Sequence, residues 1–65
     1  MDPNATYTLY RAALRAKSID LAVEYAGYLA DWLSAGGFPP AALRNPRMRA
    51  AFDAFVARYV QGRQA

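Results

Sequence analysis

Hydrophobic residues recur at the spacing of an amphipathic helix in the first segment of the chain. The repeat predicts a helix over roughly residues 3–16, because positions three and four apart share one face of a helix. Asp2 followed by Pro3 supplies the start signal, a side-chain acceptor at the cap and a fixed backbone angle in the first turn. The apolar positions of this helix are Tyr7, Tyr10, Ala13 and Leu14.

A second helical segment follows, with Ser18 as its predicted cap and Asp20 near its positive N-terminal end. Its apolar positions cover about two-thirds of the circumference at about 100° per residue, whereas an ordinary surface helix has an apolar stripe only a little wider than about 100°. One neighbour cannot cover that arc, so we predict a central helix enclosed on at least two sides. The apolar positions are Ile19, Leu21, Ala22, Val23, Tyr25, Ala26, Tyr28, Leu29, Ala30, Trp32 and Leu33. The polar strip contains Asp20, Glu24, Gly27, Asp31 and Ser34.

Glycine and proline mark the end of the second helix. The glycine pair 36–37 supplies the left-handed conformation that closes a helix, and Phe38 is placed to fold back onto Trp32 or Leu33. The proline pair 39–40 prevents continuation.

A third helix is predicted over roughly residues 46–61, with Gly62 near its end. Asn45 followed by Pro46 repeats the start signal of the first helix. Between the second and third helices, residues 40–44 allow one short helical turn. The apolar face of the third helix contains Met48, Phe52, Phe55, Val56 and Tyr59.

The predicted fold is therefore all-α, a single domain over residues 1–65 that forms a small three-helix bundle. Aromatic side chains at helical spacing are usually core residues. We assign to the core Tyr10, Tyr25, Trp32, Phe38, Phe52 and Phe55.

Part of the sequence resembles a recurrent class of short helical proteins of unknown function in bacteria and bacteriophages. The resemblance rests on Asp-Pro-Asn-Ala-Thr at 2–6 and above all on Asp-Trp-Leu-Ser-Ala-Gly-Gly-Phe-Pro at 31–39, and it covers about the first 40 residues. It implies a helix followed by a Gly-Gly-Phe-Pro stop, and no activity.

The second helix is also similar to a tetratricopeptide hairpin, through Ala22, Ala26 and Leu29. The chain departs from that pattern at Tyr10, where the first helix usually has a small residue, and at Ser34, where a closing proline is usual. There is also a single copy, whereas such repeats need about three for stability.

The length of the chain leaves a thin stability margin. A chain of 65 residues buries only about 60% of the surface that its unfolded form exposes, and small domains usually add disulfides, a metal or oligomerisation. With no Cys and no His, association with itself or with a partner is the remaining route. No leader pattern and no apolar run of about 20 residues occurs, so we expect a cytoplasmic protein that does not enter a membrane.

The sequence contains few side chains suited to catalysis. Without His or Cys, the available general bases are carboxylates, Lys17 or a tyrosine. The one cluster of carboxylates, on the second helix, could hold a hard cation but is more often a solvated face. We expect no enzymatic activity, no cofactor or metal and no small-molecule substrate.

Charge is segregated along the chain. The second helix carries three of the five acids and no base, while the rest carries eight bases and two acids, for a net charge of +3. Arg11 and Arg15 repel each other at i,i+4, as Asp20 and Glu24 do, so we expect pairing between helices or between subunits.

Two functions are compatible with these surfaces. Leu21 and Tyr28 lie at the outer edge of the apolar arc, where a three-helix monomer cannot easily cover them, and tyrosine is favoured at interfaces. We therefore expect a non-enzymatic protein–protein interaction module, either a homo-oligomer or a partner of a larger protein.

The alternative is a nucleic-acid-associated accessory protein with a basic surface. The 12 residues from Gly36 to Arg47 are too long and proline-rich for the turn of a helix-turn-helix motif. Its candidate residues are Arg11, Arg15, Arg44, Arg47 and Arg58, with Lys17 and Arg49 beside them.

Overall fold

The computed structural model describes residues 1–61, and this part of the chain is helical throughout apart from its connections. It contains α1 (Pro3–Arg15), α2 (Ile19–Ser34) and α3 (Pro46–Phe55). A short 3-10 turn, η1 (Ala41–Arg44), precedes α3, and a π-helical segment, η2 (Val56–Gln61), continues it. The predicted all-α, three-helix bundle with an extra turn is confirmed.

Two helices begin at the Asx-Pro signals that the sequence predicts. The Asp2 side chain accepts from the backbone N–H groups of Asn4 at 3.0 Å and Ala5 at 3.3 Å. The Asn45 side chain does the same at the start of α3, accepting from the N–H of Arg47 at 2.9 Å. These bonds satisfy N–H groups that have no partner within the helix. Ser18 occupies the cap position of α2, but its side chain makes no capping bond, so its predicted role is wrong.

Both α1 and α2 end in the same hydrogen-bonded motif. Gly36 has φ 91°, and Gly37 N–H donates to the carbonyl of Trp32 at 2.9 Å. Lys17 takes the equivalent left-handed position after α1, with φ 59°, and Ser18 N–H reaches back to the carbonyl of Ala13. The predicted glycine stop is confirmed, and a lysine makes the same turn without the steric freedom of glycine.

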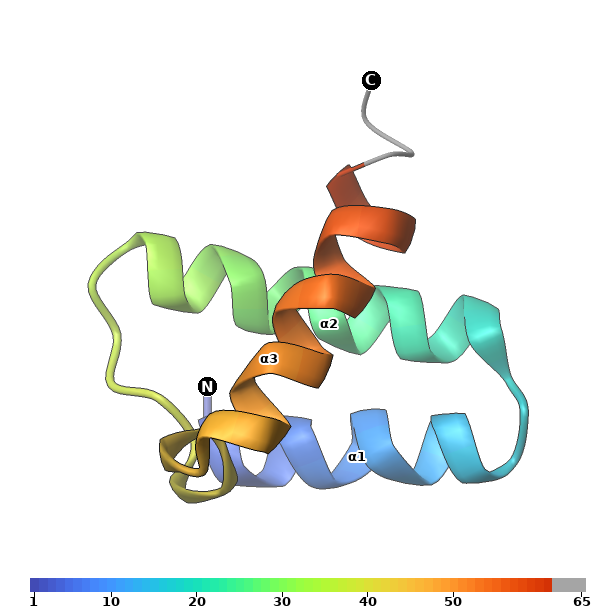
Figure 1. Ribbon diagram of the computed structural model, residues 1–65, viewed down its shortest axis with the longest axis horizontal. Coiled ribbons are helices and arrows are strands. Elements are labelled where there is room, and N and C mark those ends of the chain that lie inside the picture. The colour runs from blue at the N-terminus through green and yellow to red at the C-terminus, as the bar shows by residue number, and fades with distance from the viewer. Residues whose placement is uncertain (62–65) are drawn as a thin grey trace.

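The three helices form a hairpin with one helix laid across it. Figure 1 shows α1 and α2 running antiparallel side by side, while α3 starts near the beginning of α1 and runs obliquely toward α2, which its continuation η2 contacts. η1 is held to the first turn of α1 by a hydrogen bond from Ala41 N–H to the Asn4 side-chain oxygen, 2.8 Å long. This bond fixes where the chain turns back to begin α3.

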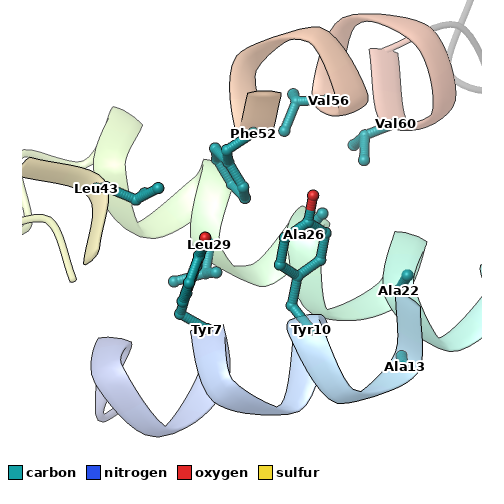
Figure 2. Packing of buried hydrophobic residues seen from close by; sticks show 10 residues of the cluster. All are labelled: Tyr7, Tyr10, Ala13, Ala22, Ala26, Leu29, Leu43, Phe52, Val56 and Val60. Carbon is teal, nitrogen blue, oxygen red and sulfur yellow. The ribbon is translucent and has the colours of Figure 1, made fainter. Parts of the chain in front are cut away.

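The core lies where the hairpin meets α3 and η2. Figure 2 shows Tyr7 and Tyr10 of α1 pointing toward Leu29 and Ala26 of α2, with Phe52 above them. Leu29 and Ala26 are fully buried, and α2 contacts both α1 and η2. The prediction that α2 is enclosed on more than one side is confirmed. The buried apolar residues are Tyr7, Tyr10, Ala13, Ala22, Ala26, Leu29, Leu43, Phe52, Val56 and Val60.

Tyr10 is the centre of an aromatic cluster in this core. Its ring meets Phe52 at 5.5 Å and Phe55 at 5.3 Å, both nearly edge-on, an arrangement that aromatic quadrupoles favour. Burial, with a smaller contribution from the neighbouring Tyr7, raises the pKa of Tyr10 to about 12. The phenol therefore stays neutral in the folded protein.

The structure corrects two details of the predicted core and third helix. Phe38 is 60% exposed and lies outside the core, because the ring that it packs against, Trp32, is itself only partly buried. Tyr25, Trp32 and Phe55 are partly buried. The α-helical geometry of the predicted third helix stops at Phe55, and the predicted end near Gly62 lies outside the described residues. The wider turn of η2 leaves both valines, at 56 and 60, buried.

Candidate protein-interaction surface

Among residues 1–61, one side of α2 has no neighbouring helix packed over it. Large hydrophobic side chains that are exposed within residues 1–61 are Met1, Leu9, Ile19, Leu21, Tyr28 and Phe38. Leu21 and Tyr28, 46% and 50% exposed, are seven residues apart and therefore within about 20° of each other on the helix. We call the surface formed by Leu21, Tyr28, Trp32, Met1 and Phe38 the open edge of α2.

The open edge contains an open hollow of about 430 Å³. Tyr28 and Trp32 of α2 line it with Met1, and Asp31 borders it. The hollow therefore combines two aromatic side chains, a flexible thioether and one exposed negative charge.

Trp32 is held in place from the connection that follows α2. Its indole N–H donates to the carbonyl of Phe38 at 2.8 Å, and the two rings meet edge-on at 5.6 Å. The predicted contact between Phe38 and Trp32 is thus confirmed, although Phe38 itself stays exposed. A Cβ atom at Gly37 would overlap the indole ring, so this close approach requires glycine.

Tyr28 is oriented by a neighbour one turn earlier on the helix. Its hydroxyl donates to the Glu24 carboxylate at 2.9 Å. That hydrogen bond, and secondarily the negative charge of Glu24, raise the pKa of Tyr28. The phenol therefore remains a neutral donor, and the apolar ring borders a line of carboxylates on α2.

Of the two predicted kinds of charge pairing, pairing between helices is wrong for the described residues, and pairing between subunits stays a prediction. Across residues 1–61 the ion pair present joins Arg49 to Asp53, within α3, at 3.0 Å. α2 presents to solvent the side that carries Asp20, Glu24 and Asp31. The basic residues that precede and follow α2 in the sequence lie on other elements or connections. Among residues 1–61 the charges of α2 are therefore not neutralised by ion pairs.

The candidate arginines are distributed over four elements. Arg11 and Arg15 lie on α1, Arg44 ends η1, and Arg47 lies in the first turn of α3. Arg58 lies in η2, with its guanidinium 5.5 Å from the centre of the Tyr59 ring. All but the half-buried Arg11 are exposed.

These arginines do not form one compact patch. Asn4 places η1 beside the start of α1, while Arg15 is eleven residues further along the same helix, a distance of about 16 Å. Arg44 and Arg47 form a smaller group at the corner where η1 meets α3, at the lower left of Figure 1.

The rest of the described chain offers less chemistry than the open edge. A second hollow, of about 340 Å³, lies between α2 and α3, where the Arg49–Asp53 pair on its wall is already neutralised. No three acidic side chains in the described chain are grouped as a metal site would require. None of the helices formed by residues 1–61 is both long and apolar enough to cross a membrane.

Sequence reasoning identified part of the open edge. Leu21 and Tyr28 are exposed there together, as the width of the apolar arc indicates. The roles of Met1 and Asp31 in the hollow were missed, since the approach of the N-terminal residue to α2 is a tertiary contact. The spacing of Tyr28, Asp31 and Trp32 at i, i+3 and i+4 was the available signal for the rest of the hollow.

Comparison of the chain with known protein families, with characterised proteins and with solved structures gives no match.

Proposed function

We propose that this chain is a non-enzymatic interaction protein that self-associates through the open edge of α2. The observation that carries the proposal is the joint exposure of Leu21 and Tyr28 on one side of α2, together with the aromatic hollow that Tyr28 lines. Apolar side chains grouped on the surface of a small protein mark association sites more often than isolated ones do.

The thin stability margin of a small domain supports the same proposal. The accessible surface of the protein is 4352 Å², and a standard interface covers about 800 Å² on each partner. Association of this size would cover about a fifth of that surface, and would stabilise the fold through mass action. The open edge supplies the apolar centre of such an interface, and the acids of α2 supply part of its polar rim.

The chemistry of the side chains supports a non-enzymatic role. His and Cys are absent from the sequence, and the two tyrosines with a raised pKa are weaker acids than usual. Neither phenol is prepared for proton transfer near neutral pH.

Sedimentation velocity over a range of protein concentrations tests this proposal. We expect the sedimentation coefficient to rise with concentration, and Leu21→Glu or Tyr28→Glu to abolish that rise. Ile19→Glu is the matched control, since Ile19 is 42% exposed on the same helix but lies about 160° around it from Leu21. A wild-type protein that stays monomeric at every accessible concentration contradicts the proposal.

The nucleic-acid alternative makes a different prediction. It requires retention of DNA or RNA that weakens steeply as salt is raised, and loss of that retention when Arg44 and Arg47 are replaced. The spread of the arginines over the length of α1 argues against one binding patch, so we expect no retention at physiological ionic strength.

A further inference from the structure

Two exposed charges lie at helix ends where the helix dipole disfavours them. Asp31 is in the last turn of α2, which contains no base, and Arg47 is in the first turn of α3, which contains no acid. A helix carries partial negative charge at its C-terminus and partial positive charge at its N-terminus. Within residues 1–61 neither side chain has an ion-pair partner. Each charge would be stabilised by an opposite charge from outside the chain.

The surroundings of Asp31 fit one kind of cation particularly well. The hollow beside it is lined by the aromatic side chains of Tyr28 and Trp32. A guanidinium group stacks on aromatic faces and pairs with a carboxylate at the same time, whereas an ammonium group is more strongly hydrated and is a point charge. The hollow is therefore suited to an arginine side chain.

The chain itself carries the complementary surface. α2 has three acids and no base, while the stretch from η1 through the first turns of α3 has Arg44, Arg47 and Arg49 before its first acid, Asp53. Arg49 is paired with Asp53, which leaves Arg44 and Arg47 as exposed positive charges at one corner of the molecule.

We infer that a second copy of this chain docks head to tail on the hollow, placing its Arg47, flanked by Arg44, against Asp31, Tyr28 and Trp32. This inference rests on the proposed self-association and specifies its geometry. The contact relieves both unfavourable helix-end charges at once. Because the two surfaces differ, every added copy presents a new hollow and a new arginine corner, so association continues into rings or chains instead of ending at a symmetric dimer.

Charge reversal on the two surfaces tests this geometry. We expect Asp31→Arg and Arg47→Glu each to raise the dissociation constant for self-association at least about tenfold, because each places like charges in contact. An equimolar mixture of the two variants contains two pairs of surfaces with opposite charges. One pair is the unaltered hollow of the Arg47→Glu chain with the unaltered corner of the Asp31→Arg chain, and the other is the two altered surfaces, whose charges are both reversed. In sedimentation velocity the mixture should associate with near wild-type affinity through the unaltered pair, while either variant alone associates at least about tenfold more weakly.

Matched variants separate this result from a general effect of charge. Asp20→Arg and Arg15→Glu change the net charge by the same amounts at exposed positions outside the hollow and the corner, and should leave self-association within about twofold of wild type. Far-UV circular dichroism checks that all four variants fold.

The outcomes distinguish the two proposals. If the wild-type protein is monomeric throughout, the proposed self-association itself fails. If the wild-type protein associates but the mixture behaves as the sum of its two components, or if Asp20→Arg weakens association as much as Asp31→Arg, the head-to-tail inference is overturned while self-association stands.

Discussion

Replacement of Leu29 by alanine tests the packing of the bundle most sharply. Leu29 is fully buried in α2, between the aromatic side chains of α1 and the residues of α3. Truncating a fully buried leucine costs about 2–5 kcal/mol. A domain of 65 residues has a total free energy of unfolding of about 3–10 kcal/mol. Leu29→Ala should therefore remove at least about a fifth of the stability, and about half of it at the middle of both ranges.

Leu21→Ala is the matched control for that experiment. It makes the same chemical change on the same helix, but Leu21 is 46% exposed, so the free energy of unfolding should change by less than about 1 kcal/mol. Urea denaturation followed by far-UV circular dichroism measures both. The protein must be dilute enough to be monomeric, because association would add stability. Equal losses for the two variants would refute the assignment of the inner and outer sides of α2.

Three further predictions follow from individual contacts. Below pH 10 the Tyr10 phenol is protonated in both the folded and the unfolded protein, but between pH 10 and its folded pKa of about 12 it ionises only in the unfolded chain. The free energy of unfolding should therefore fall by about 2–3 kcal/mol over that range. A pH titration of Tyr10→Phe should show a smaller fall. Gly37→Ala should displace the indole of Trp32 and shift its fluorescence emission, and an unchanged spectrum would contradict the close packing. Asn45→Ala removes the cap of α3 and should cost about 1 kcal/mol in thermal unfolding; no measurable loss would show that the cap is not required.

The features that sequence reasoning recovered are those with local causes. Asp2 and Asn45, each followed by proline, begin helices because their side chains bond to N–H groups two residues away. The glycine at position 36 ends α2 because its backbone reaches φ 91°. The central position of α2 follows from the width of its apolar arc, which is a property of the segment alone.

The features that were missed depend on contacts between segments. The exposure of Phe38 depends on the position of Trp32, the partly buried ring that it packs against. Lys17 adopts φ 59° in a turn that gives no sequence signal, since lysine is rarely chosen for that conformation. The π-helical register from Val56 onward is a change of hydrogen bonding that residue spacing does not reveal. Pairing between the charges of different helices was expected because the sequence does not show how far apart the folded chain holds them.

We propose that this chain meets a second copy at the open edge of α2. NMR chemical shifts recorded at increasing protein concentration test this contact residue by residue. We expect concentration-dependent shifts at Leu21, Tyr28 and the indole N–H of Trp32, with smaller changes at buried Leu29 and Phe52. Spectra that are the same at all concentrations, or shifts confined to residues away from this edge, would contradict it.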